Sequence, residues 1–352
     1  MQEHATTGST AADVNNGHGR GPLGERGRHR LCVAPMMDWT DRHARAFMRG
    51  FGPDIVLYTE MVTAPAVLHG DRQRLLGFDP CEHPLALQLG GSEPEELARA
   101  AELGAAAGYD EINLNVGCPS DRVQSGRFGA CLMREPERVA ACVAAMRSAV
   151  DLPVSVKCRL GVDDHDSTEH LDAFIDEVAA AGCSLFIIHA RKAILGGLSP
   201  KQNRDIPPLQ YPRVHALAQR RRDLEIIING GLRTLADATR ELAHVDGVML
   251  GREAYGNPAI LGTLDAALLR PDVAAVSAAE ALLRYRPYMV ARLAEGVALH
   301  AMTRHLLGLF TGLPGARRYR RILSEQGCRS HAGIDVLDAA VAAVDGSQAQ
   351  AA

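Results

Sequence analysis

The sequence predicts an α/β protein, a (β/α)8 or TIM barrel followed by a small C-terminal α-helical domain. Eight short apolar runs lie between Leu31 and Arg252, and several of them are separated by segments of helical periodicity. This alternation is typical of a parallel sheet covered by helices. Polar or glycine residues follow the runs, and after Pro258 the pattern is helical only. The alternative, a doubly wound open sheet, would concentrate such residues near one switch point.

The runs predict strands at eight places, and the segments between them carry helix signals. Ser92 and Glu95 predict a capping box, and Thr234 with Asp237 predicts a cap for the helix before the last strand. Gly108 is suited to end one helix, and Pro136 to begin another. The expected strands are Leu31–Met36, Ile55–Val62, Pro84–Gly90, Glu111–Val116, Val154–Arg159, Leu185–Arg191, Glu225–Gly231 and Gly247–Arg252.

Length and composition divide the chain and limit its function. The 352 residues suit one large and one smaller domain. We expect a polar, disordered tail over residues 1–30, the barrel over 31–265 and a helical domain over 270–345. A net charge of −4 means that any RNA contact needs a local basic patch. The eight cysteines form no CxxC pair and have no zinc spacing, which indicates reduced thiols and no metal site.

Apolar runs in the sequence are all shorter than the roughly 20 residues that cross a bilayer. The first residues also lack the apolar stretch of a secretory signal. We therefore expect a cytoplasmic protein, a monomer with no membrane contact.

A single thiol stands where one expected strand ends. Residues Glu111–Val116 alternate as a strand does, so Asn113 and Asn115 share one face. Gly117 and Pro119 then break the strand on either side of Cys118. Most free cysteines are small buried hydrophobes, and that is the alternative here. The chemistry at the other strand ends favours a reactive thiol.

The last two strands end in a pattern suited to phosphate. Asn229-Gly230-Gly231 and Gly251-Arg252 follow strands seven and eight, which is where this barrel commonly binds phosphate. Gln88, Lys157 and His189 stand at other strand ends, and each could instead serve as an ordinary structural residue. Together, an amide, a lysine and a phosphate cup suit FMN, because the reduced flavin is anionic and needs a fixed cation.

Two further basic segments lie outside the strands. The long connection from Lys192 to Pro212 has no helical period, and it carries Lys201 and Arg204. Long loops in compact domains are usually functional, so this one is a lid or binding loop, or else a solvated insertion. Arg317, Arg320 and Arg321 fall on one side of an expected helix. They predict a phosphate-binding face, with a solvated helix face as the alternative.

The expected strand ends carry an ordered series of motifs. They are Ala34–Asp41, Tyr58–Met61, Gln88–Gly91, Asn113–Ser120, Val156–Arg159, His189–Lys192, Asn229–Gly231 and Gly251–Ala254. This series resembles that of the tRNA-dihydrouridine synthases. The Leu198–Lys201 to Pro207–Leu209 segment and Pro314–Arg317 are similar to the A subfamily in particular. Cys158 is a local departure, where the family often has another small residue.

This resemblance implies an enzyme, an oxidoreductase that uses FMN and NADPH (or NADH) to reduce the C5–C6 bond of uridine at positions 20 and 20a in the D-loop of tRNA. It implies that Cys118 is the catalytic acid and that Asn115, Lys201, Arg204, Arg317 and Arg320 contact tRNA. An FMN-dependent oxidoreductase of free pyrimidines, of the dihydroorotate dehydrogenase type, is the alternative, but it has no use for the arginine helix. By the same resemblance, the residues expected to hold FMN are Pro35, Met36, Met37, Gln88, Lys157, His189, Asn229, Gly230, Gly231, Gly251 and Arg252.

Overall fold

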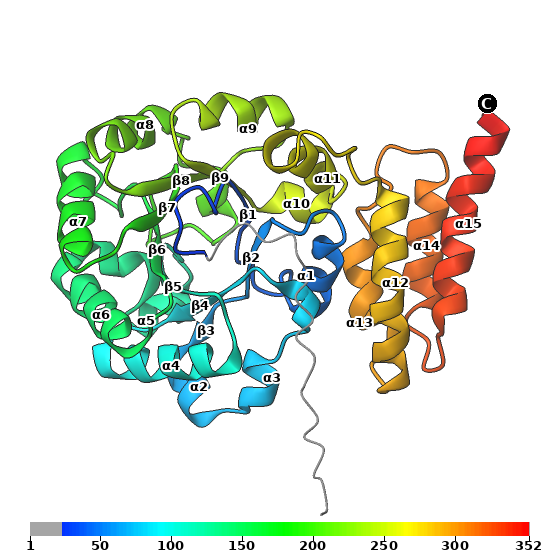
Figure 1. Cartoon of the computed structure of the whole chain (residues 1–352), viewed down its shortest axis with the longest axis horizontal. Helices are drawn as coiled ribbons and strands as arrows, with labels where there is room; N and C mark the ends of the chain where they lie inside the picture. Colours follow the sequence, from blue (N-terminus) through cyan, green and yellow to red (C-terminus); the bar gives the residue numbers. More distant parts are fainter. Residues whose placement is uncertain (1–22, 352) are drawn as a thin grey trace, which may run out of the picture.

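A closed barrel of eight parallel strands forms most of the molecule, as predicted, and a group of helices lies at its side (Figure 1). The computed structural model describes residues 23–351. Neighbouring strands follow the order β2-β1-β9-β8-β7-β6-β5-β4, and pairing of β2 with β4 closes the barrel. A short strand β3 (Val62–Thr63) adds to β4. The barrel strands are β1 (Leu31–Val33), β2 (Val56–Tyr58), β4 (Leu85–Gly90), β5 (Glu111–Val116), β6 (Val154–Arg159), β7 (Leu185–His189), β8 (Glu225–Asn229) and β9 (Gly247–Leu250).

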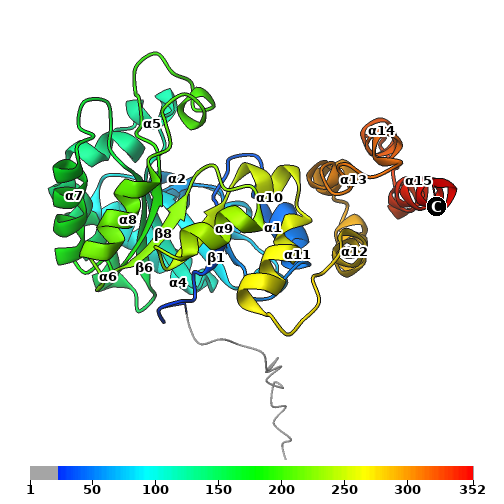
Figure 2. The same cartoon turned by 90° about the horizontal axis from the view of Figure 1, so that it is seen from above.

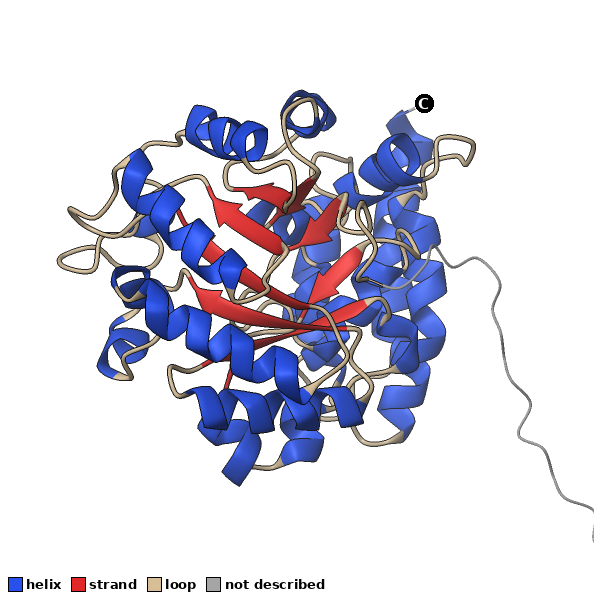
Figure 3. Cartoon of the chain, turned by 60° about the vertical axis from the view of Figure 1, so that its left-hand side comes forward, coloured by secondary structure: helices blue, strands red, loops and turns tan. Residues whose placement is uncertain are grey.

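Helices surround the sheet on the outside (Figure 3). The helices of the barrel region are α1 (Arg42–Arg49), α2 (Ala64–His69), α3 (Arg72–Leu76), α4 (Pro94–Ala107), α5 (Asp121–Ser125), α6 (Pro136–Ala149), α7 (Thr168–Ala180), α8 (Tyr211–Arg220), α9 (Leu235–Leu242), α10 (Arg252–Gly256) and α11 (Ile260–Leu264). Short helical turns occur at η1 (Pro80–Glu82), η2 (Gly129–Arg134), η3 (Gln202–Arg204) and η4 (Asp265–Leu269).

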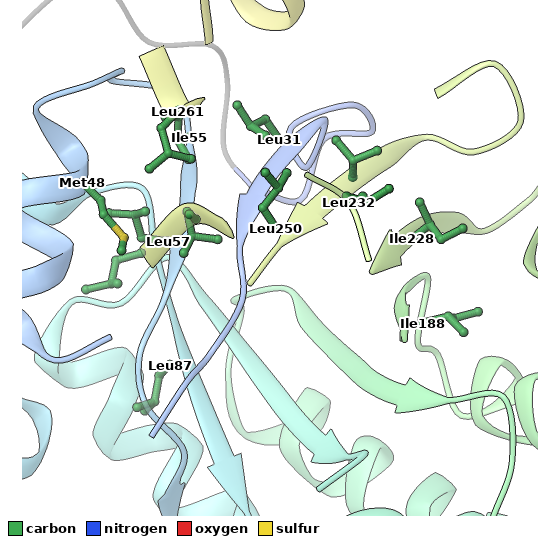
Figure 4. Close-up of a cluster of buried hydrophobic side chains, with 14 of the residues drawn as sticks. Leu31, Met48, Ile55, Leu57, Leu87, Ile188, Ile228, Leu232, Leu250 and Leu261 are labelled. Atoms are coloured by element: carbon green, nitrogen blue, oxygen red, sulfur yellow. The ribbon is translucent and has the colours of Figure 1, made fainter. Parts of the chain in front are cut away.

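Each strand places alternate residues inside and outside the barrel, because side chains of a strand alternate between its faces. The outward residues pack against the surrounding helices and form the main core. Figure 4 shows Leu57, Leu87 and Leu250 from the strands together with Met48 of α1 and Leu261 of α11. A second, smaller apolar cluster fills part of the barrel interior, and it includes Cys32, Ala34, Tyr58, Ile187, Ile227 and Met249.

Three of the four predicted helix signals are confirmed. Thr234 and Asp237 form a capping box, Pro136 occupies the first turn of α6, and Gly108 ends α4 with a φ of 97°. The predicted Ser92–Glu95 box is wrong. Helix α4 begins at Pro94, and its N-cap is Glu93, which makes no side-chain capping bond. Proline lacks an N–H and favours the first helical position, so it moves the start of the helix past Ser92.

The ordered part of the chain begins before Leu31. Leu23 and His29 are buried, and the His29 Nε2 atom lies 2.5 Å from Glu111 Oε2 at the closed end of the barrel. The Gly27 N–H donates to Glu225 Oε1 at 3.0 Å. The expectation of disorder over residues 1–30 is therefore wrong for 23–30, because these residues have partners in the barrel that composition does not reveal. Residues 1–22 lie outside the described part of the chain.

The C-terminal helices pack beside α1 (Figure 1). Asp41, the N-cap of α1, also accepts hydrogen bonds from Arg304 at 2.5 Å and from His305 at 3.0 Å. His43 Nδ1 lies 2.8 Å from the Tyr288 hydroxyl. The C-terminal elements are α12 (Ala278–Ala294), α13 (Leu299–Thr303), η5 (Arg304–Leu306), α14 (Ala316–Gln326) and α15 (Ile334–Ala351). Within residues 23–351, every helix is too short or too polar to cross a membrane.

Candidate active site

A cavity of about 600 Å³ opens at the carboxyl ends of the barrel strands. This volume is typical of small-molecule sites, and this end of the barrel is where such enzymes carry their chemistry. Its lining includes Cys118, Asn115 and Arg204. It also includes all eleven residues predicted to hold a cofactor, Pro35, Met36, Met37, Gln88, Lys157, His189, Asn229, Gly230, Gly231, Gly251 and Arg252.

The glycine pair after β8 shapes one side of the cavity. Gly230 has a φ of 113° and Gly231 a φ of 75°, values that residues with a side chain rarely adopt. A Cβ atom at Gly231 would lie 2.5 Å from Leu209 Cδ1, so a larger residue there would have to displace that side chain as well as adopt the strained φ. Nearby, Arg252 Nη1 donates to Asp205 Oδ1 at 2.7 Å. The exposed backbone of Gly231 and the Arg252 guanidinium both line the cavity, and such groups are suited to an anionic group such as phosphate.

Lys157 is a cation held at the floor of the cavity. Its Nζ donates to Asn229 Oδ1 at 3.2 Å. Burial, together with the nearby charge of Arg159, lowers the pKa of Lys157 from its ordinary value of 10.5 to about 8. Keeping Lys157 protonated in this buried place therefore costs free energy, and an anion bound beside it would reduce that cost.

His189 offers a ring nitrogen with no protein partner. Its Nδ1 is buried and makes no hydrogen bond to the described residues. Burial lowers the pKa of His189 well below its ordinary value, and Arg159 and Lys157 act in the same direction. The ring is therefore neutral at pH 7, and a ligand in the cavity can satisfy the free nitrogen. This orphan atom, the Lys157 cation and the glycine-lined wall all fit FMN.

The loop after β5 holds Cys118 at the cavity. The N–H groups of Gly117 and Cys118 donate to Asn115 Oδ1 at 3.1 and 3.0 Å. The Cys118 carbonyl accepts from the Ala130 N–H at 2.9 Å, and the Cys118 Sγ lies 3.5 Å from Ser120 Oγ. Cys118 is half-buried, whereas the cysteines on the outward faces and in the core, Cys32, Cys142, Cys158 and Cys183, are buried. Its thiol is thus exposed to whatever occupies the cavity.

Comparison with known proteins gives the chain a family. A family model described as "Dihydrouridine synthase (Dus)" matches residues 32–344. This chain belongs to the dihydrouridine synthase family. The resemblance seen in the sequence is confirmed, and with it the prediction of an enzyme, an oxidoreductase acting on tRNA.

Individual relatives agree with the family model. A protein of Xanthomonas axonopodis pv. citri named tRNA-dihydrouridine(20/20a) synthase is 57% identical over 318 residues, covering 90% of this chain and 94% of its own. One of the same name from Pseudomonas aeruginosa is 56% identical over 295 residues, covering 84% and 89%. A solved complex of a 2-naphthoyl-CoA reductase with 2-naphthoyl-CoA aligns at a TM-score of 0.52 and 11% identity, over 69% of this chain and 51% of that one, and shows the fold alone.

Arg159 is a site residue of this family member that we did not select from the sequence. It lines the cavity, and its Nε donates to the Gly117 carbonyl at 2.9 Å. Its Nη1 donates to the carbonyls of Lys192 and Asn203 at 3.1 and 3.0 Å. Burial lowers the pKa of Arg159 to about 10. Arg159 thus ties the Cys118 loop to the long loop after β7. Its place two residues after Lys157, on the same strand face, was the available signal.

The long loop after β7 is anchored and ordered. Asn203 is buried; its Oδ1 accepts from the Ile194 N–H at 2.7 Å, and its Nδ2 donates to the carbonyls of Ile194 and Leu198 at 2.8 and 3.1 Å. This places Arg204 in the cavity wall, as predicted for a binding loop, while Lys201 is exposed and lies outside the lining.

Some of the residues singled out in the sequence lie outside the cavity. Asn113 does not reach the cavity, although it shares a face with Asn115, because it lies one layer deeper and is fully buried. Arg317 and Arg320 lie on α14, outside the cavity lining, with Arg317 exposed and Arg320 half-buried. In Figure 2, α14 and the loops around α5 lie toward the same edge of the molecule. Met61, Ser120, Arg233 and Glu253 line the cavity and were not selected.

Proposed function

We propose that this protein reduces the C5–C6 double bond of uridine in the D-loop of tRNA, at positions 20 and 20a, with FMN as cofactor and NADPH as reductant. The observation that carries the proposal is that Cys118 and the complete predicted cofactor set line one cavity. The names of its relatives support the choice of positions. Because tRNA is the substrate, we place the enzyme in the cytoplasm and assign it no membrane partner.

The cofactor would be held by backbone and side-chain groups that line the cavity. Gly230, Gly231 and Arg252 would bind the phosphate, and His189 would use its free Nδ1. Gln88 would contact the ring edge, and Lys157 would face the anionic part of the reduced ring. Bound FMN, reduced by NADPH, would supply the hydride that is added to C6 of uracil.

Cys118 would complete the reduction by donating the thiol proton to C5. Hydride addition at C6 leaves negative charge on C5 and the O4 oxygen, and the proton transfer removes it. Lys157, Arg159 and Arg204 place positive charge at the cavity, where it would stabilise that charge as it develops. Bulk solvent then returns a proton to the thiolate. The hydrogen added at C6 would thus come from the cofactor as a hydride, and the hydrogen added at C5 would come from the Cys118 thiol as a proton.

The tRNA would be held outside the cavity. A base inside a folded tRNA cannot reach the cavity floor, so the target uridine must leave its stack. Arg204 and Lys201 of the long loop would hold the nearby backbone, and Arg317 and Arg320 on α14 would contact phosphates further away. Asn115 would contribute one amide hydrogen, because its oxygen already accepts two backbone N–H groups and its other amide hydrogen is donated to Gln88 Oε1.

Mapping dihydrouridine in tRNA from cells that lack the gene tests this proposal. We expect the loss of dihydrouridine at positions 20 and 20a, and its return when the gene is restored. Dihydrouridine that persists at both positions would contradict the proposal. The purified protein, with NADPH, should also reduce unmodified tRNA and leave free uridine and dihydroorotate unchanged. Turnover of a free pyrimidine instead of tRNA would favour the dihydroorotate dehydrogenase type.

A further inference from the structure

A chain of buried hydrogen bonds crosses the barrel interior. It starts at the closed end of the barrel, which is the end where the strands begin, opposite the cavity. It begins at Glu111, the first residue of β5, whose Oε1 accepts from the Ser155 hydroxyl of β6. The Ser155 Oγ in turn accepts from Asn113 Nδ2 at 2.7 Å. All three side chains are fully buried. The alternation of strand residues brings them to the inside of the barrel, where they form one polar column.

The column continues upward to the thiol. Gln88 Nε2 donates to Asn113 Oδ1 at 2.7 Å, and Asn115 Nδ2 donates to Gln88 Oε1 at 2.8 Å. Asn115 Oδ1 then accepts the N–H groups of Gly117 and Cys118. Gln88 is 1% exposed and Asn115 is 9% exposed. One line of hydrogen bonds therefore joins a carboxylate at the closed end to the loop that carries Cys118.

The two ends of this column determine the direction of every bond in it. Side-chain amides can turn over, exchanging donor and acceptor. At the upper end, the backbone N–H groups of Gly117 and Cys118 can only donate, so Asn115 must present its oxygen. At the lower end, the Glu111 carboxylate can only accept, so Ser155 must donate to it. Both ends require the same sequence of orientations in between, and that is the sequence observed.

Glu111 is itself held by two more donors. The Tyr58 hydroxyl donates to its Oε1 at 3.1 Å, and His29 Nε2 lies 2.5 Å from its Oε2. Burial disfavours the charged form of His29, but Glu111 and Glu225 outweigh this and raise the pKa of His29. None of Glu111, Tyr58 and His29 is in the cavity lining. The lower end is thus a fixed acceptor remote from the chemistry.

We propose that Glu111 is a positioning residue, whose carboxylate acts through Ser155 and Asn113 to orient the Gln88 amide and to hold the Cys118 loop by way of Asn115. Reversal of the column would aim the Asn115 NH2 at two backbone donors, each left unpaired at a cost of about 1–3 kcal/mol. The opposite side of the interior is filled by apolar residues, among them Ile187 and Ile227, so the barrel does not need polar groups to be filled.

The test compares near-isosteric variants in the full-length protein as purified. Glu111→Gln replaces the pure acceptor by a group that also donates, and Ser155→Ala breaks the column in its middle. Tyr58→Phe is the matched control, because it removes a buried bond to the same Glu111 oxygen and leaves the column intact. The readouts are the iodoacetamide alkylation rate of Cys118, followed on its peptide by mass spectrometry, and the absorption spectrum of bound flavin.

We expect Glu111→Gln and Ser155→Ala to change the alkylation rate of Cys118 by about tenfold and to shift the flavin bands, because a displacement on the order of 1 Å can alter a rate by that much or more. Tyr58→Phe should lower the melting temperature and leave both readouts at wild-type values. A Ser155→Ala protein that matches Tyr58→Phe in both readouts would overturn the proposal, whether or not Glu111→Gln folds. With tRNA, kcat should fall while KM stays constant.

This inference rests on the proposed roles of Cys118 and Gln88, but its failure can be told from theirs. The alkylation rate requires neither tRNA nor turnover. If the protein left uridine in tRNA unreduced, the proposed function would be refuted. The Cys118 alkylation rates of the wild-type protein and the three variants would still confirm or overturn the role of Glu111.

Discussion

The barrel cavity and the α14 helix both offer positive charge, but they hold it differently. In the cavity, Lys157 is bonded to Asn229, and Arg159 to three backbone carbonyls. On α14, Arg317 and Arg321 project into solvent, and Arg320 is half-buried. A small rigid ligand needs charges fixed in space, whereas a long polyanion needs charge spread along a surface. The difference supports the proposed division, in which the barrel would carry the chemistry and the helical domain would contribute affinity.

The largest effect that would sharpen this division is expected at Cys118. Cys118→Ala should lower kcat on tRNA by about 10³-fold, since a positioned general acid contributes roughly 10²–10⁴. Flavin binding, flavin reduction by NADPH and tRNA affinity should remain. Stopped-flow reduction and tRNA turnover, measured on the same preparation, separate these steps.

Cys131→Ala is the matched control for that substitution. Cys131 is also half-buried and lies on η2, which follows α5 after the Cys118 loop, but it is outside the cavity lining. Turnover should survive in this variant. If Cys118→Ala lost its flavin instead, the thiol would be structural and the assignment of an acid would fail.

A second, smaller effect concerns the cost of holding charge in the cavity. The pKa of Lys157 is lowered from 10.5 to about 8, mainly by burial. Removing the ammonium should therefore stabilise the flavin-free protein at pH 7, by up to about 3 kcal/mol at 1.36 kcal/mol per pKa unit. Lys157→Met keeps the aliphatic part of the side chain. It should raise the free energy of unfolding and abolish flavin binding.

The pH dependence of that stability difference has a definite sign. Because the folded state lowers the pKa, the unfolded chain binds the proton more tightly between pH 8 and 10.5. The wild-type protein gains stability relative to Lys157→Met as pH rises through this range, so the difference should be largest at pH 7 and close by about pH 10.5. Urea unfolding of both flavin-free proteins across this range measures it. A difference independent of pH would show that the cause lies elsewhere than in the charge.

The cavity lining can be predicted from the sequence because a barrel brings the residues that follow its strands to one end of the fold. Once eight strands were recognised, their carboxyl ends had to meet, and the residues at those ends had to line one opening. The bounds expected for β5 and β6, Glu111–Val116 and Val154–Arg159, are the observed ones. The alternation of β5 also correctly put Asn113 and Asn115 on one face, though not in one layer.

What the sequence did not predict depends on partners far along the chain. Arg159 acts through the carbonyls of Lys192 and Asn203, and although its place on the Lys157 face of β6 is visible in the sequence, these partners are not. The helical pattern after Pro258 does not show the change from α13 to η5, where Arg304 and His305 turn toward Asp41. The order of residues 23–30 likewise depends on contacts with Glu111 and Glu225. Such contacts follow from the folded arrangement and leave no periodic signal.

The smallest predicted effect tests the helical domain itself. The double variant Arg317→Glu/Arg320→Glu should weaken tRNA binding about tenfold or more and reduce the salt dependence of binding by roughly two phosphate contacts. NADPH oxidation without tRNA should not change, because α14 lies outside the cavity lining. Arg74→Glu/Arg99→Glu is the control, since it makes the same change in net charge at exposed positions on α3 and α4. Equal weakening in both variants would mean that tRNA responds to overall charge, and the functional distinction between the two regions would then be lost.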